Sequence, residues 1–306
     1  MPHISELLKL PDEAQRYLWG DLLIVGGLSI IAGPPKRGKS TLIRNLVANV
    51  ARNATGIPRL ATEAAQDASD GATAPLIASD APAGFLGASL LKGPVLHITL
   101  EDDASYLARA FRELGVTAND PLYVEIGPKA FRNDAVAIEW LASKIDETKA
   151  ILCVIDPLFK FVKMRSISNY AAVNQAIEPL LRLARDTGCH ILTAHHTTKG
   201  KTKDPMNSIL GSTAIFGAVD TAMLIDEVDE SDPKLADYRR IWVKQKYGRG
   251  FAHRPTRFNA RDWAHETVYR RVDGGERIVE GYREYWEAWI TGLESQGIKG
   301  AREWVN

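Results

Sequence analysis

The sequence has little cysteine, no net charge and no long apolar run, and each absence excludes a class of protein. Only two cysteines occur in 306 residues, Cys153 and Cys189, and both stand in apolar surroundings. We interpret them as small buried side chains of a reduced, cytoplasmic protein rather than as a disulfide or a metal site. The 38 basic residues balance 38 acidic ones, so any nucleic-acid contact must come from local basic segments. No apolar stretch approaches the roughly 20 residues of a membrane-spanning helix, so no membrane partner is expected.

Short apolar runs alternate with helical patterns between about residues 27 and 226. The runs are continuous, as in strands that are buried on both faces of a sheet. They are LSIIAG (28–33), VLHITLE (95–101), ILCVID (151–156), HILTAH (190–195) and AMLID (222–226). Helical periodicity is typical of residues 134–146 and 170–188, with Asp134 as the expected N-cap and Gly188 as the expected C-terminal stop. The alternation predicts an α/β fold with a mostly parallel sheet and helices on both faces.

Two parts of the chain depart from this pattern. Residues 53–82 are rich in small and polar residues, and we expect a mobile surface insertion there. From about residue 238, the segments RRIWVKQKYG, TRFNA and ETVYRRV favour additional antiparallel strands. Near the end, large apolar residues recur at helical spacing, which predicts an amphipathic helix docked on the core or on a neighbouring subunit. They are Tyr282, Tyr285, Trp286, Trp289, Ile290 and Leu293.

The stretch AGPPKRGKSTL (32–42) lies between the first apolar run and a helical segment. Its spacing of Gly33, four residues and then Gly38-Lys39-Ser40 is typical of a loop that binds nucleotide phosphates. In such a loop the lysine faces the outer phosphates, the serine hydroxyl ligates Mg²⁺, and the following helix contributes its positive N-terminal end. The sequence therefore predicts an ATP and Mg²⁺ site. Its expected nucleotide-binding residues are Gly33, Pro34, Pro35, Lys36, Arg37, Gly38, Lys39, Ser40 and Thr41.

Carboxylates end the next two apolar runs. Asp156 ends ILCVID, at a position from which it can hold the Mg²⁺ shell together with Ser40. Glu101 ends VLHITLE, where a carboxylate beside the phosphate-binding strand can act as the general base that aligns water. Asp102 and Asp103 are expected to begin the following helix and to favour its N-terminus.

Five segments together resemble a known family. AGPPKRGKSTL, VLHITLEDD, ILCVIDPLFKF, HILTAHHTTKG and GSTAIFGAVDTAMLI follow one another as in RecA-fold ATPases of the plasmid RepA helicase group, which are relatives of DnaB-type hexameric replicative helicases. The resemblance covers about Gly26 to Arg249. It implies a RecA-like P-loop core, ATP hydrolysis with Glu101 as the catalytic glutamate, and a homo-oligomeric ring. A hexamer is expected, although the sequence leaves the ring size open.

The resemblance also implies that His196, with His195 beside it, senses the γ-phosphate. A zinc site or purely structural hydrogen bonds are the alternatives for this pair. Adjacent strand residues point to opposite faces, and no further ligand motif accompanies them, which favours the sensor.

Two basic segments follow the third and fourth runs, where related rings line a channel for single-stranded DNA. Here these segments could instead be solvated loops without a ligand. A third basic segment, RRIWVKQKYGRG, carries Lys246 and Arg249 where related rings reach the neighbour's γ-phosphate, and either residue is a candidate. The candidate DNA contacts are Lys160, Lys163, Arg165, Lys199, Lys201 and Lys203.

The leading hypothesis is an ATP-driven DNA motor, a helicase of the RepA type, that binds or moves along single-stranded DNA. The alternatives are a RecA-fold ATPase without unwinding activity, in recombination, repair or mobile-element maintenance, and a KaiC-like regulatory ATPase. The expected organisation is an N-terminal segment (1–25), an ATPase domain (26–260) and a C-terminal tail with a strand and a helix (261–306).

Overall fold

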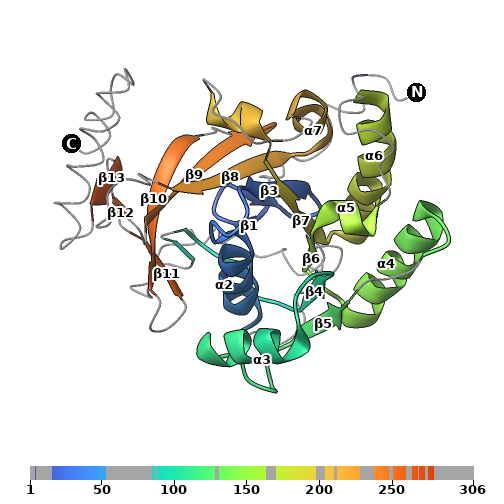
Figure 1. Ribbon diagram of the computed structural model, residues 1–306, viewed down its shortest axis with the longest axis horizontal. Coiled ribbons are helices and arrows are strands. Elements are labelled where there is room, and N and C mark those ends of the chain that lie inside the picture. Colours follow the sequence, from blue (N-terminus) through green and yellow to red (C-terminus); the bar gives the residue numbers. More distant parts are fainter. Residues whose placement is uncertain are drawn as a thin grey trace.

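The computed structural model describes residues 4, 16–52, 85–86, 88–127, 131–162, 170–197, 204–209, 212–227, 238–247, 251–259, 264–267, 269–272 and 275–278. Within them, a nine-stranded sheet has the order β11-β10-β9-β8-β3-β7-β6-β4-β5 (Figure 1). Its strands are β3 (Leu28–Gly33), β4 (Val95–Thr99), β5 (Leu122–Ile126), β6 (Leu152–Asp156), β7 (His190–His196), β8 (Thr221–Glu227), β9 (Tyr238–Gln245), β10 (Phe251–Asn259) and β11 (Ala264–Thr267).

The direction of the strands divides the sheet into two parts. From β8 to β5 every neighbouring pair is parallel, and β9, β10 and β11 add to the β8 edge in antiparallel pairs. The predicted α/β fold and its antiparallel extension are confirmed. The predicted strand ETVYRRV is divided, because β11 ends at Thr267 and the next strand belongs to another sheet. Two small antiparallel sheets pair β1 (Tyr17–Trp19) with β2 (Leu23–Ile24) and β12 (Tyr269–Val272) with β13 (Gly275–Ile278).

Helices cover both faces of the parallel strands. Alternate residues of each strand enter opposite cores, so that Ile30 packs with α4, α6 and α7 while Ile31 packs with α2 and α3. The side chains of Leu18, Trp19 and Leu23 join the core on the α2 side. The helices are α2 (Lys39–Ala51), α3 (Ala104–Glu113), α4 (Asp134–Thr148), α5 (Leu158–Phe161), α6 (Tyr170–Thr187) and α7 (Ser212–Ala218), with a 3₁₀ turn η1 (Pro205–Ser208).

The ends of the helices correct one sequence prediction and confirm another. Asn133, not Asp134, is the N-cap of α4, because its Oδ1 accepts a hydrogen bond from the backbone N–H of Val136 at 3.0 Å. Helix α6 ends at Thr187, and Gly188 follows with a φ of 69°, as a C-terminal glycine does. Cys153 and Cys189 are both buried and free, as predicted.

Two predicted segments cannot be compared with the structure. The insertion at 53–82 and the amphipathic helix near the C-terminus lie outside the described residues. In the part of the chain that is described, no helix has the length and apolar character to cross a bilayer.

Two buried histidines predict that acid lowers the stability of the fold. Burial lowers the pKa of His190 to about 4, although the Ile24 carbonyl, 2.6 Å from Nδ1, acts in the opposite direction. Burial, with the charge of Arg44, lowers the pKa of His97 to about 3. Both side chains titrate near 6.5 when unfolded, so the unfolded chain binds protons that the native one does not as pH falls below about 6.5. The free energy of unfolding should then decrease by up to ~1.4 kcal/mol per pH unit for each histidine.

Urea denaturation at several pH values between 7.5 and 4.5 tests this expectation. His97→Gln and His190→Gln should each make the acid dependence shallower, whatever they do to stability at pH 7.5. An unchanged pH dependence in both variants would contradict it.

Candidate functional site

The loop that joins β3 to α2 has a backbone that the sequence makes possible at two glycines. A Cβ on Gly33 would lie 2.7 Å from Cγ2 and 2.8 Å from the carbonyl oxygen of Ile225, so β8 leaves no room for a side chain. Gly38 precedes α2 with a φ of 88°, in the left-handed region that favours glycine. No side chain caps α2, and its first turn holds no acidic residue. The positive end of the helix is therefore available to an anion.

Lys39 begins α2 and is almost fully buried, with 7% of its surface exposed. Burial lowers its pKa, while the negative charges of Asp156 and Glu101 oppose that shift. The ammonium group therefore lies within electrostatic reach of both carboxylates.

Ser40 and Asp156 form a pair at the end of β6. The Ser40 hydroxyl hydrogen-bonds the Asp156 carboxylate, whose pKa is raised by burial against the opposing effects of Ser40 and Lys39. β6 is held against β4, because Thr99 is the register partner of Asp156 and the Leu100 N–H donates to the Asp156 carbonyl at 2.9 Å. A hydroxyl and a carboxylate oxygen are hard ligands of the kind that Mg²⁺ prefers, so the two residues fit the predicted metal.

Glu101 follows β4 and keeps 46% of its side chain exposed. Its Oε1 lies 2.9 Å from Nζ of Lys160, which belongs to α5. The sequence analysis assigned Lys160 to DNA and did not foresee this ion pair.

His195 and His196 point to opposite faces of β7, as strand geometry predicts. His195 is buried, and its ring meets Phe159 edge-on with 4.3 Å between ring centres. His196 is exposed and is the register partner of Gly33, at the start of the loop. Partial burial lowers the pKa of His196, and so does the charge of Lys39, while Glu101 and Asp156 oppose the shift. His196 thus lies near the residues that surround the loop.

The two ends of β9 lie at opposite edges of the sheet. At one end, Nε of Arg239 donates to the carbonyl of Arg37 in the loop at 3.1 Å. Beyond the other end, the N–H of Lys246 bonds the carbonyl of Asp220, which precedes β8, at 2.8 Å. The structure therefore brings Arg239, which the sequence analysis missed, to the loop and leaves Lys246 away from it.

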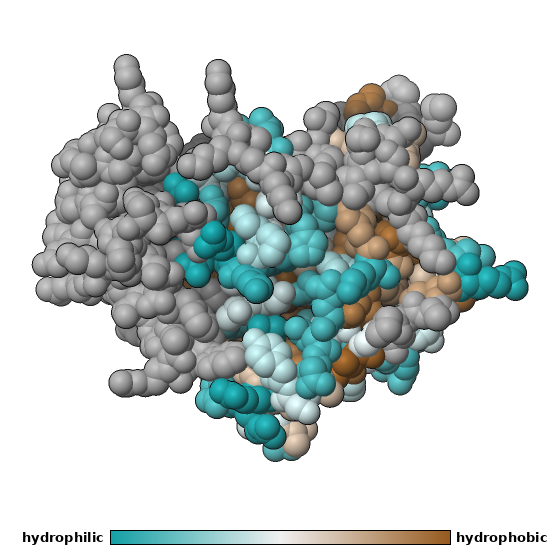
Figure 2. All heavy atoms as spheres, viewed as in Figure 1, coloured by the Kyte–Doolittle hydropathy of each residue, from teal (hydrophilic) through white to brown (hydrophobic). Residues whose placement is uncertain are grey.

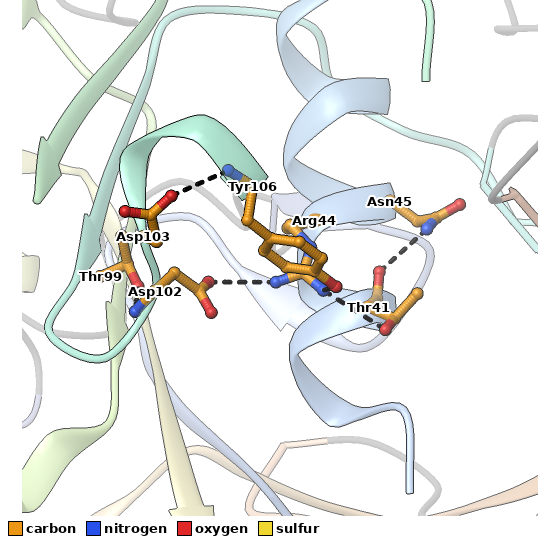
Figure 3. A network of polar contacts seen from close by, with 7 residues as sticks. All are labelled: Thr41, Arg44, Asn45, Thr99, Asp102, Asp103 and Tyr106. Carbon is orange, nitrogen blue, oxygen red and sulfur yellow. Dashed lines mark hydrogen bonds and ion pairs between the residues drawn. The ribbon is translucent and has the colours of Figure 1, made fainter. Parts of the chain in front are cut away.

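Asp102 and Asp103 do different things, which corrects the sequence prediction for Asp102. Asp103 caps α3, because its Oδ1 accepts from the N–H groups of Ser105 and Tyr106. Asp102 instead forms an ion pair with Arg44 of α2, at 3.1 Å (Figure 3). No sequence signal marked Arg44, since it lies within an otherwise ordinary helix.

The surface around the loop is polar. Figure 2 shows hydrophilic residues gathered over α2 and the neighbouring strand ends, with hydrophobic colours toward α4 and β5. On β5 the side chains of Tyr123, Val124 and Ile126 are exposed. Six predicted site residues lie outside the described part of the chain: Lys163, Arg165, Lys199, Lys201, Lys203 and Arg249.

Comparisons with known proteins agree with this geometry. A family model described as an AAA domain matches residues 3–68 and 74–202. The solved ATPase domain of a helicase is 13% identical with a TM-score of 0.57, and the match covers 87% of this chain and 96% of that one. A KaiC-like protein from the hyperthermophilic archaeon Pyrococcus horikoshii OT3 is 12% identical with a TM-score of 0.52, covering 83% and 99%. No curated protein matches the sequence. The two structures share the RecA-like α/β fold with this chain.

Two lysines of the loop allow a matched test of nucleotide binding. Lys39→Ala should weaken ATP binding by about 10- to 100-fold, since it removes a charge-assisted contact from a buried position. Lys36→Gly should bind ATP like the wild type, because Lys36 is exposed and has a φ of 63° that glycine adopts without strain. Titration with a fluorescent ATP analogue measures both. Equal affinities in the two variants would contradict the role given to Lys39.

Proposed function

Because the chain belongs to the AAA domain family and has the fold of a RecA-like ATPase, we propose that it hydrolyses ATP at the β3–α2 loop. The observation that carries this proposal is the Ser40–Asp156 hydrogen bond beside the buried Lys39. It joins the phosphate-loop sequence to the carboxylate of a neighbouring strand, and Glu101 follows the strand beyond.

Each of these residues has a role in the proposed reaction. Lys39 and the N-terminal end of α2 attract the outer phosphates of ATP. Ser40 and Asp156 would hold Mg²⁺, which when bound neutralises phosphate charge. Glu101 accepts a proton from the attacking water, and its exposure leaves room for that water. His196, one strand away, senses the γ-phosphate.

Glu101→Gln should separate hydrolysis from binding. The amide cannot take a proton, so kcat should fall by about 100-fold or more while ATP affinity stays near that of the wild type. Asp103→Asn is the matched control, because Asn also caps helices and only the neighbouring charge is lost. Steady-state hydrolysis and nucleotide titration measure the two effects. A normal rate in Glu101→Gln, or an equal loss in Asp103→Asn, would show that another group is the base.

We propose further that hydrolysis is coupled to single-stranded DNA, as in a motor of the RepA type. The Lys160–Glu101 ion pair supports this, since one ammonium group cannot hold Glu101 and a DNA phosphate in the same geometry. A phosphate that attracts Lys160 would release the Glu101 carboxylate for water. DNA binding and catalysis would thereby be linked through a single side chain.

Lys160→Met tests the link. Its DNA-free rate of ATP hydrolysis should rise several-fold, because Glu101 has lost its partner, and the stimulation by single-stranded DNA should become smaller. Lys144→Met is the control, because Lys144 pairs with Glu125 and Glu147, neither of which belongs to the site. The assay is ATP turnover with and without oligonucleotide at low and high salt. A lower basal rate in Lys160→Met would mean that the lysine assists Glu101 instead of occupying it. If DNA does not stimulate the wild type, an ATPase without motor activity or a KaiC-like regulatory ATPase replaces the motor.

The proposed motor is a cytoplasmic ring of several copies, with residues 26–260 as the ATPase domain. Lys246 and Arg249 remain the candidates for a finger that reaches the next copy's ATP. The position of Lys246, away from the loop of its own chain, supports a role between copies.

A further inference from the structure

Arg44 is a buried charge that joins the phosphate loop to the turn that carries Glu101 (Figure 3). Only 4% of its side chain is exposed, and its Nη1 lies 3.1 Å from Oδ2 of Asp102. Nη2 lies 3.3 Å from the hydroxyl of Tyr106 and 3.4 Å from Oγ1 of Thr41, both weaker contacts. The guanidinium carbon lies 5.2 Å from the centre of the Tyr106 ring. Arg44 therefore bonds its own helix and the β4–α3 connection.

The burial of this arginine is not explained by stability. Neighbouring residues of α2, such as Ile43 and Leu46, are apolar and fill the core. A buried ion pair gains little over apolar packing of the same volume, because both charges must lose their water. Within the described residues, Nε of Arg44 has no hydrogen-bond partner, so the guanidinium is not even fully satisfied. Another requirement must favour a charge at this position.

The contacts of Asp102 indicate what that requirement is. Asp102 directly follows Glu101, and its backbone N–H donates to Oγ1 of Thr99 at 3.2 Å. Asp103, the next residue, caps α3. The turn is thus fixed to β4 by Thr99, to α3 by Asp103 and to α2 by Arg44. Of these three attachments, only the one through Arg44 reaches the helix that begins at the phosphate loop.

We propose that Arg44 is a positioning residue that sets the place of Glu101 relative to the phosphates. The proposal rests on the function given above, in which Glu101 is the general base. A base must lie within about 2.6–3.2 Å of the water it activates. A shift of about 1 Å can cost about 100-fold in rate, so the Arg44–Asp102 bond affects catalysis without touching ATP.

Arg44→Met should lower kcat by about 10- to 100-fold and change ATP affinity by less than about 3-fold. The reason is that no hydrogen bond joins Arg44 to Lys39, Ser40 or Asp156 in the described structure. Arg44→Lys keeps the charge and most of the volume, so it should fold and should recover part of the lost rate. Arg112→Met, at the exposed last turn of α3, is the control and should leave both quantities unchanged.

The decisive comparison repeats Arg44→Met in a Glu101→Gln background. If Arg44 acts through Glu101, the second substitution should not lower the residual rate further, and the two effects should not add. A residue with a merely structural role would lower the residual rate again or weaken ATP binding in both backgrounds. Either of those results overturns the proposal.

The two proposals fail in different ways. Wild-type turnover in Glu101→Gln would overturn the assignment of the base, and with it this role for Arg44. Loss of turnover in Glu101→Gln, together with a wild-type kcat in both Arg44→Met and Arg44→Lys, would overturn only the role of Arg44. Circular dichroism and urea denaturation establish that each variant is folded under the assay conditions.

Discussion

The common edge at which the parallel strands end is the constraint on which the site depends. Gly33 lies beside His196 and Thr99 lies beside Asp156 in the register of the sheet, so residues far apart in the sequence meet there. Because side chains alternate between the faces, a slip of one residue in β6 would turn Asp156 to the other face. The apolar residues that precede these positions enter two different cores, and this burial holds the register. The packing of the sheet thereby determines the chemistry at its edge.

Electrostatic balance is the second constraint, because the site gathers charges in a place with little water. Burial favours the neutral forms of Lys39 and Asp156, and each opposes that effect by stabilising the charge of the other. A polyphosphate in the loop would add negative charge next to Asp156 and Glu101. Further cations must then compensate, and Mg²⁺, Lys160 and Arg239 are in reach of that role. The arrangement therefore suits an anion that arrives together with a metal ion.

Much of the site could be predicted from the sequence because its signals are local. The loop and Asp156 follow continuous apolar runs, which a reader of the sequence finds without knowing the fold. Strand β5 was missed because its side chains are half-buried or exposed, so no continuous apolar run marks it. Arg44 was missed for another reason: its partner is 58 residues away, and no pattern in a helix reveals such a pair. The same holds for Lys160, whose basic character suggested DNA but whose contact with Glu101 depends on how β6 and β4 lie side by side.

The direction of β9 bears on how copies of the chain could act together. β9 is antiparallel to β8, so Arg239 lies at the edge of the loop and Lys246 lies beyond the opposite edge. At about 3.3 Å per residue, the seven positions between them span roughly 23 Å, which is far longer than a lysine side chain. Lys246 therefore cannot reach a phosphate bound in its own loop while β9 keeps this register. If it acts on ATP at all, that ATP is bound by another copy of the chain, and a monomer would lack that contribution.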